Sequence, residues 1–427
     1  MAAFAFRFEW EESPRVRAPE LSATWARLEI HVNTKVITRV DAERSGSVRT
    51  GIYVPLFPIA EWMVSNWFFL WDEWRRDAPQ SRHNLLSARE GFALPDLAFH
   101  PTESHMELIW RRKAAPYSGL EFLAEGAATV LKAAVREECT RLIEAVVERL
   151  NGIPAKDRGI GSRLDSDWGF VKAVLANEAQ KEFSERAARL GHDPFAVEEG
   201  LAEQIENLGS VLPEPLVDDF CDAIPLGEIT SGAETVRSFI ESAAPMAQAA
   251  PAWEDVLREV RSQKTDTPWR DGYRQASRFR AYLGLNGRTP PDLAHYLSHK
   301  LGVFAAKEFA APSGIDGIFW RFEGRAPVFG IPGSLRDERK RFVIARALGD
   351  FLSFGEGSLI THGPTEHQQR NRAFAAEFLA PAHALQNRIR TAAVGEEAIE
   401  ELAAEFRVSP FVIRHQIQNR RLAALSI

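Results

Sequence analysis

Histidine and carboxylate side chains are the residues of this sequence whose types and spacing suit metal chemistry. A helix that holds a catalytic zinc ion often carries His-Glu-x-x-His, because two imidazoles one turn apart bind the metal and the glutamate deprotonates the bound water. None of the 11 histidines lies in such a motif. His362, Glu366 and His367 are close in sequence, and with Asp350 they form an alternative set of metal ligands.

Other signatures of catalysis are absent from the sequence. It has no Walker A loop, no GxGxxG after a strand and no GxSxG turn, which disfavours classical nucleotide and acyl-transfer chemistry. His295 and His299 have the i, i+4 spacing of a chelating pair, but without an evident third ligand we predict a solvated helix face. Cys139 and Cys221 lie far apart, which excludes a disulfide framework and a cysteine-based zinc site and indicates a reducing compartment, the cytoplasm.

The segment from about residue 396 to 420 has the pattern of a helix-turn-helix. Ser409 is suited to cap its second helix, and Pro410 is suited to the first helical position. DNA recognition by this helix would use Arg414, His415, Gln418 and Arg420. Five glutamates between residues 396 and 405 oppose a basic DNA-binding surface, so we favour a structural role.

Length and composition describe an ordinary globular protein. A chain of 427 residues exceeds what one hydrophobic core usually organises, which favours two or three domains. With 45% hydrophobic and 26% charged residues it is able to bury sizeable cores, and a net charge of -7 provides no overall attraction for nucleic acid. The most apolar run, from Ile52 to Trp74, contains prolines and charged residues, so we expect no membrane span.

Residues 1–152 are predicted to form an α+β domain. Alternating or β-branched patterns predict strands over 26–32, 35–40, 52–54 and 106–110. The four tryptophans between residues 62 and 74 fall largely on one side of a helix, which we interpret as buried core. Apolar residues three and four apart predict a long helix over about 120–150.

The rest of the chain is predicted to be mostly helical. A linker over residues 152–166, rich in Gly, Lys and Asp, precedes a helical middle domain at 166–245. An Ala/Pro-rich tract at 243–251 marks a second connector, and a C-terminal domain follows at 265–427. The expected fold class is therefore α+β and mostly helical.

The order of elements from Trp269 onward is distinctive. An amphipathic helix is followed by strand-like segments at 315–317 and 327–329. Next come Arg-Phe-Val-Ile-Ala-Arg-Ala-Leu-Gly-Asp at 341–350 and Ala-Phe-Ala-Ala-Glu-Phe-Leu-Ala-Pro at 373–381. This succession resembles the ImmA/IrrE family of zinc metallo-endopeptidases, and the resemblance implies a zincin-like fold with a small sheet.

The resemblance also implies which positions carried the chemistry. In that family the first of these helices contains His-Glu-Leu-Gly-His, and a later helix supplies an acidic third ligand. The positions of the two histidines, the glutamate and the acidic ligand are held here by Arg346, Asp350, Ala347 and Gln368, respectively. Leu348 and Gly349 match the family, so we interpret the domain as a pseudo-peptidase that keeps the helix and has lost its catalytic and metal-binding residues.

The substituted positions predict a polar binding cleft. Arg346 and Asp350 stand at i and i+4, so we predict an ion pair in which the guanidinium fills the space of the missing cation. Gln368 and Glu377 complete the predicted cleft, although the default role of Glu377 is structural.

We therefore expect a cytoplasmic, non-catalytic regulatory or scaffolding protein that binds another protein and holds no cofactor. By analogy with the family, its setting would be stress response, toxin–antitoxin control or phage defence. Two alternatives stay open: a zinc metallo-endopeptidase with relocated ligands, and a DNA-binding regulator that uses the C-terminal helix-turn-helix.

Overall fold

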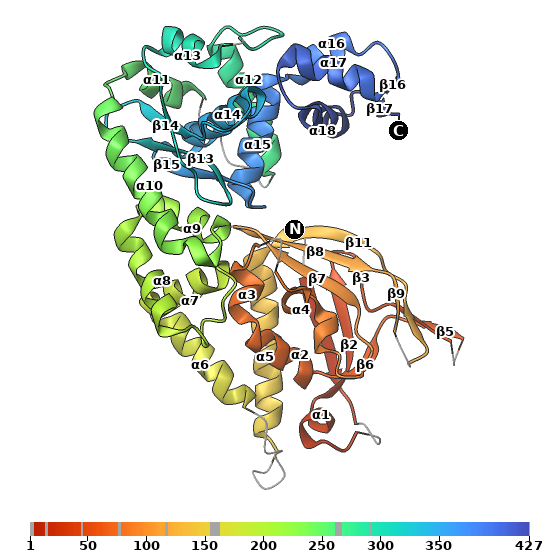
Figure 1. Cartoon of the computed structure of the whole chain (residues 1–427). Helices are drawn as coiled ribbons and strands as arrows, with labels where there is room; N and C mark the ends of the chain where they lie inside the picture. The colour runs from red at the N-terminus through yellow and green to blue at the C-terminus, as the bar shows by residue number, and fades with distance from the viewer. Residues whose placement is uncertain are drawn as a thin grey trace. The chain divides into compact units, whose positions relative to one another are not determined.

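The computed structural model describes residues 4–12, 16–43, 46–75, 78–115, 118–153, 163–260, 267–290 and 292–426 (Figure 1). The chain forms two compact units, Met1–Glu199 and Gly200–Ile427, which we call the N-terminal and C-terminal units. The fold is α+β and mostly helical, which confirms the predicted class. Among the described residues, no helix is both long enough and apolar enough to cross a membrane.

The N-terminal unit contains three sheets whose neighbouring strands are all antiparallel. The first consists of β1 (Phe4–Trp10), β2 (Trp25–Val32), β3 (Lys35–Val36) and β6 (Ile52–Pro55). The second has the order β5 (Ser47–Arg49), β4 (Val40–Ala42), β10 (Leu120–Phe122) and β9 (Lys113–Ala115). The third has the order β11 (Gly126–Leu131), β8 (His105–Arg111) and β7 (Asp96–Pro101).

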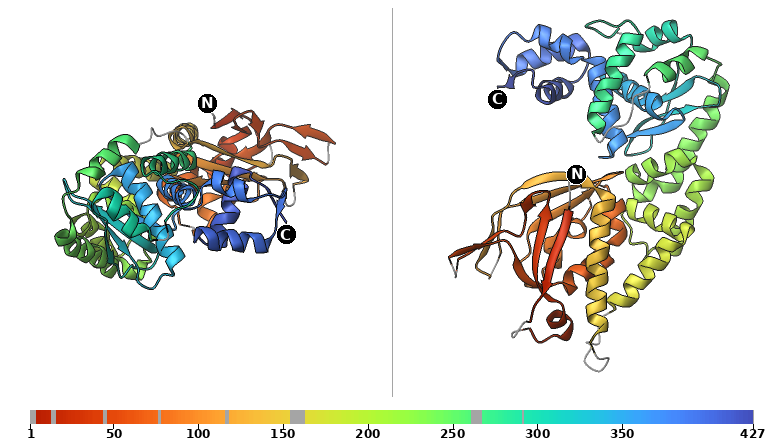
Figure 2. Two further views of the ribbon diagram at one scale, coloured as in Figure 1. Left: turned by 90° about the horizontal axis from the view of Figure 1, so that it is seen from above. Right: turned by 180° about the vertical axis from the view of Figure 1, so that it is seen from behind.

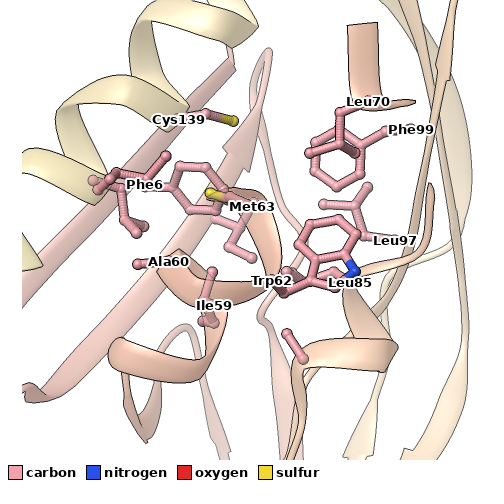
Figure 3. Packing of buried hydrophobic residues seen from close by; sticks show 14 of the residues in the cluster. Phe6, Ile59, Ala60, Trp62, Met63, Leu70, Leu85, Leu97, Phe99 and Cys139 are labelled. Carbon is pink, nitrogen blue, oxygen red and sulfur yellow. The ribbon is translucent and has the colours of Figure 1, made fainter. Parts of the chain in front are cut away.

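Helices cover these sheets and enclose an aromatic core. They are α1 (Pro19–Ala23), α2 (Phe57–Ser65), α3 (Trp67–Asp72), α4 (Gln80–His83), α5 (Lys132–Asn151), α6 (Leu164–Ala176) and α7 (Glu178–Arg189). All four tryptophans between residues 62 and 74 are buried, as predicted, although Asn66 divides their segment into two helices. Trp62 and Phe99 pack among the aliphatic side chains of this core (Figure 3).

The long helix of this unit begins later than predicted. Residues 120–122 form β10, residues 126–131 form β11, and α5 starts at Lys132. The backbone explains the difference, because Gly126 has a φ of 154°, which a helix does not accept, and the strand pairs with β8 as far as Leu131. In Figure 2, α5 runs along the strands of this unit, and it packs against β1, β8 and β11.

The boundary between the two units falls inside the segment predicted as one helical domain at 166–245. Helices α6 and α7 belong to the N-terminal unit. The C-terminal unit begins at the second residue of α8 (Glu199–Val211) and continues with α9 (Glu214–Ala223), α10 (Ile229–Ala243) and α11 (Pro251–Val260). Most of the predicted linker at 152–166 lies outside the described residues.

The remainder of the C-terminal unit is built around one four-stranded sheet. Its order is β12 (Ala305–Glu308), β14 (Pro327–Ile331), β13 (Ile315–Arg321) and β15 (Gly357–Thr361), and only β12 and β14 are parallel. The helices are α12 (Pro268–Tyr282), α13 (Leu293–Leu301), α14 (Asp337–Phe354), α15 (Glu366–Leu379), α16 (Ala382–Arg388), α17 (Glu396–Phe406) and α18 (Pro410–Arg420). Two-residue strands β16 (Ala393–Val394) and β17 (Ala424–Leu425) pair beside the last two helices.

Candidate functional site

Helices α14 and α15 carry the predicted site residues, and glycine lets them pack closely. Helix α14 packs against β13, β14, β15 and α15, and α12 packs against α15. A Cβ atom at Gly349 would lie 2.8 Å from the ring of Phe374, and one at Gly272 would lie 2.2 Å from the backbone oxygen of Arg370. Both positions therefore need glycine, because a close-packed interior leaves no volume for a methyl group. Gly349 of the family-like string thus has a packing role that is independent of catalysis.

Gly272→Ala is expected to lower the free energy of unfolding by about 2 to 3 kcal/mol. The added methyl group overlaps backbone of α15, and this overpacking outweighs the better helix propensity of alanine. Urea denaturation measures the change. Gly200→Ala in α8 is the control, since no heavy atom lies within 4 Å of its Cβ position, and it should cause no loss. Equal stability of the two variants would contradict the close packing of α12 on α15.

Arg346 is buried in the middle of a polar network. Its side chain is 3% exposed. The guanidinium Nε donates to Oδ1 of Asn371 at 2.8 Å, and Nη2 donates at 2.6 Å both to Oε1 of Gln368 and to the carbonyl oxygen of Thr361. Burial lowers the pKa of Arg346 to about 10, so the group is still a cation at neutral pH.

Asp350 belongs to the same network, but the predicted ion pair with Arg346 is wrong. Arg346 instead pairs with Asp316 of β13, with Nη1 at 3.4 Å from Oδ2. The amide of Asn371 connects the two predicted partners: its oxygen accepts from Arg346, and its nitrogen donates to Oδ2 of Asp350 at 2.8 Å. Ser358 donates to the same carboxylate oxygen at 2.9 Å. A residue on another helix thus replaces the direct contact expected from i, i+4 spacing.

The second carboxylate oxygen of Asp350 has no hydrogen-bond partner among the described residues. The side chain is fully buried, and Oδ1 is unpaired. Burial raises the pKa of Asp350 to about 6, although the positive field of His367 and the hydrogen bond from Asn371 act in the opposite direction. Asp350 is therefore the least well compensated acid of this network.

Gln368 connects the network to the edge of the sheet. Its Oε1 accepts from Arg346 and, at 3.2 Å, from the backbone N–H of Thr361, and its Nε2 donates to the carbonyl oxygen of Leu359 at 2.8 Å. Gln368 is fully buried. The side chain that stands at the expected position of the acidic ligand is therefore used to hydrogen-bond β15.

Asp316 faces two arginines and one histidine. Arg339 donates to it at 2.8 Å, and His362 and Arg346 contact its other oxygen at 3.2 and 3.4 Å. Burial acts to raise the pKa of Asp316, but the hydrogen bonds from His362 and Arg339 outweigh burial and hold the pKa at about 2. This carboxylate supplies the counter-charge of Arg346.

The residues of the alternative metal set are not brought together as ligands. His362 is 62% exposed and contacts Asp316, whereas His367 contacts Asp219 of α9 at 2.9 Å. Glu366 is half-buried in the first turn of α15. Among the described residues, no group of three or more His, Cys, Asp or Glu side chains is arranged to hold a metal ion. His295 and His299 are exposed on α13, as predicted.

Glu377 does not belong to the predicted cleft. It is buried, its carboxylate accepts from the backbone N–H of Ala382 at the start of α16, and Nε2 of Gln416 donates to it at 3.1 Å. It therefore joins α15 to α16 and α18, while Arg346 and Gln368 form a separate cluster. The predicted cleft itself is corrected as well, because Arg346, Asp350 and Gln368 are buried rather than open to solvent.

Residues 298–418 match the family model of the IrrE N-terminal-like domain of peptidase family M78. This segment is related to the ImmA/IrrE family. The match extends from α13 to α18, so it contains Arg346, Asp350 and the residues that hydrogen-bond them. Asp219, which contacts His367, lies outside the match. No curated protein and no solved structure matches the chain.

The zinc ion that the ImmA/IrrE relationship implies does not fit the residues present. A guanidinium has five N–H donors and no lone pair for a metal, and Arg346 directs these donors at Gln368, Asn371 and Thr361. Ala347 is fully buried and offers neither a ligand nor a base. The amide of Gln368 is already engaged in five hydrogen bonds. Zinc would have to displace a cation that these groups hold.

The amide oxygen of Gln368 accepts from Arg346, Thr361 and Asn371, and its nitrogen donates to the carbonyl of Leu359 and contacts Nε2 of His367. Each of these bonds would be lost if the side chain turned to bind a metal. The network therefore has the properties of a buried structural core rather than of a ligand set.

Helices α17 and α18 occupy the segment predicted as a helix-turn-helix, and Arg407 has left-handed backbone angles where α17 ends. Both arginines proposed to contact DNA interact with other side chains of the protein: Arg414 pairs with Glu396, and the guanidinium of Arg420 lies 4.9 Å from the ring centroid of Tyr273. The ring of His415 packs against that of Phe411 with an angle of 46° between the ring planes, and Gln418 is exposed.

Arg414→Ala and Arg420→Ala are each expected to leave binding to mixed-sequence duplex DNA unchanged. Their charges are partly neutralised or packed within the protein, and phosphate binding needs free cations. A salt-titrated fluorescence anisotropy assay measures the affinity. A wild-type affinity that falls steeply with salt and drops about tenfold in either variant would revive the DNA-binding alternative.

Proposed function

We propose that the IrrE-like domain does not hydrolyse peptide bonds and that the protein is a regulatory or scaffolding factor that acts by binding another protein. The observation that carries the proposal is the position of Arg346. Its buried guanidinium stands where the resemblance to the ImmA/IrrE family places the first zinc-binding histidine, and it is held by Gln368, Asn371 and Asp316. A fixed cation in this place opposes a second cation through charge repulsion.

The edge of the sheet supports the same proposal. A peptide that adds to a sheet needs free backbone groups on the edge strand. In β15 the carbonyl of Leu359 and both backbone groups of Thr361 are already bonded to Gln368 or Arg346. The side chains that replace the metal site therefore also compete with an extended substrate. Because these residues are buried, a protein partner would contact other surfaces of the chain.

Metal content tests the proposal directly. Protein purified from zinc-supplemented medium is expected to contain no zinc and to cleave no peptide. A variant with Arg346→His, Ala347→Glu, Asp350→His and Gln368→Glu restores the family pattern and is expected to retain zinc if it folds. About one zinc per wild-type chain, lost on His367→Ala or Asp350→Ala, would overturn the proposal in favour of relocated ligands.

Partner binding needs its own measurement. Crosslinking in the native cells, followed by purification of this chain, is expected to recover a protein partner. The molar ratio of partner to chain should be constant from one preparation to the next. Arg346→Met should recover the same partner if it stays folded, because the side chain is buried. The biological setting, which the family suggests as stress response, toxin–antitoxin control or phage defence, would follow from the identity of that partner.

A further inference from the structure

Strand β11 is an edge strand whose outer side has no partner among the described residues. It comprises Gly-Ala-Ala-Thr-Val-Leu at 126–131 and pairs only with β8 in its sheet (Figure 1). The strand has no charged residue and no proline, and the side chain of Leu131 is 46% exposed. An uncharged edge of this length is a template for pairing with another strand.

The direction of its backbone groups follows from one hydrogen bond. The N–H of Lys132, the next residue, donates to the carbonyl of Ser104 on the β8 side at 3.0 Å. Backbone groups alternate in direction along a strand, so those of residues 130, 128 and 126 also face β8. The N–H groups of Ala127, Thr129 and Leu131 therefore point away from the sheet.

Other long edges of this protein are closed by side chains. In β1 the N–H of Phe6 donates to Glu138 at 3.2 Å and its carbonyl accepts from Arg141, both on α5. In β15 the outer groups bond to Gln368 and Arg346. The remaining described edge strands have four residues or fewer, or, like β7, end in a proline. These are the usual protections against edge-to-edge pairing, and β11 lacks them.

We propose that two copies of this chain pair antiparallel through β11 about a two-fold axis. Strands that pair in this way must place outward-facing residues opposite one another, which allows a register with Thr129 opposite Thr129 of the second copy. Threonine pairs across antiparallel strands are favourable. The same register places Leu131 opposite Ala127, so the exposed large side chain of one copy lies against the smallest of the other and beside Ile109.

The sequence of β11 favours a second copy of the same chain as its pairing partner. Self-pairing places no charged residues of β11 opposite one another, because the strand carries none, and it joins the two three-stranded sheets into one of six strands. Dimer formation is independent of the proposed loss of peptidase function, since it uses only the N-terminal unit.

The experiment compares the mass in solution of full-length wild type and Thr129→Pro by light scattering over a range of concentrations. Wild type is expected to be a dimer. Proline at 129 removes an outward N–H and costs no bond to β8, so the variant should be a monomer with an unchanged circular dichroism spectrum. Thr129→Lys provides a second test if the proline variant does not fold, and Thr129→Val, which keeps the N–H, should remain dimeric.

Crosslinking tests the register. Thr129→Cys is expected to form a disulfide between copies, because the two Cα atoms would lie about 5.5 Å apart. Ala127→Cys should not, since the two copies of residue 127 would be more than about 10 Å apart. A wild-type monomer at all concentrations, or a dimer that survives both Thr129→Pro and Thr129→Lys, would overturn the proposal.

Discussion

Arg346→Met is expected to lower the free energy of unfolding of the C-terminal unit by about 3 to 5 kcal/mol. Methionine fills much of the volume but donates no hydrogen bond. The oxygens of Asn371, Gln368 and Thr361 each lose a charged donor, and a buried acceptor without its partner is costly. Urea denaturation followed by tryptophan fluorescence measures the loss.

Arg339→Met is the matched control, because Arg339 contacts the same carboxylate, Asp316, but its side chain is 52% exposed. The control should change the free energy of unfolding by less than about 1 kcal/mol. If the two variants were equally stable, the guanidinium of Arg346 would not be the centre of the network, and the structural basis of the proposed function would fail.

Asp350→Asn is expected to change how stability depends on pH. The folded-state pKa of Asp350, about 6, lies above its ordinary value of 3.8. Well below pH 3.8 the group is protonated in both states and costs nothing. Between pH 3.8 and about 6 the unfolded chain ionises it while the buried group of the folded state stays protonated, so wild type loses roughly 3 kcal/mol of stability, which the neutral amide does not lose. The stability difference, variant minus wild type, should therefore rise by about that amount between pH 4 and pH 7.

The amide introduced by Asp350→Asn would also place donors where Oδ1 of Asp350 has no partner, and this shifts the free energy of unfolding equally at every pH. The change in the stability difference between variant and wild type with pH therefore reports only the ionisation of Asp350. Asp316→Asn is the control with the opposite sign: the pKa of Asp316 is lowered, so its carboxylate stabilises the fold above pH 4, and this contribution is lost as pH falls. Parallel pH profiles for Asp350→Asn and wild type would show that Asp350 is not an uncompensated buried acid.

Local pattern was sufficient to predict several parts of the structure. The strands around residues 26–32 and 106–110, the buried tryptophans and the C-terminal helix pair all follow from periodicity, which depends on neighbouring residues only. The relationship of the C-terminal segment to the ImmA/IrrE family was recognised from the order of its elements, and the family match confirms it. The string at 341–350 forms part of one helix, as expected.

The contacts of the site were harder to predict from the sequence, because they join residues that are distant in the chain. The i, i+4 spacing of Arg346 and Asp350 suggested a direct pair, but it contains no information on Asn371, which lies between them. Asp316, the counter-charge of Arg346, comes from strand β13. Asp219, the partner of His367, comes from helix α9, outside the matched segment. Only Asn371 had a local signal, since it follows Gln368 by three residues and so shares its helix face.

The strand–helix error at residues 120–131 has a different cause. A segment rich in alanine and valine is compatible with both the helical and the strand periodicity. Pairing with β8 makes residues 126–131 a strand, and a window of local sequence does not contain this tertiary contact. The sequence carried one sign against a helix here, the glycine at position 126, which is unfavourable inside a helix and has a φ of 154° in the structure.

The arrangement of Arg346, Gln368 and Asn371 has a consequence for how this chain can evolve. Each side chain hydrogen-bonds the other two, so changing any one of them alone leaves a buried group unpaired and lowers stability. A set of metal ligands at these positions would therefore need several simultaneous changes. The three residues are epistatic, and this coupling opposes stepwise replacement of any one of them.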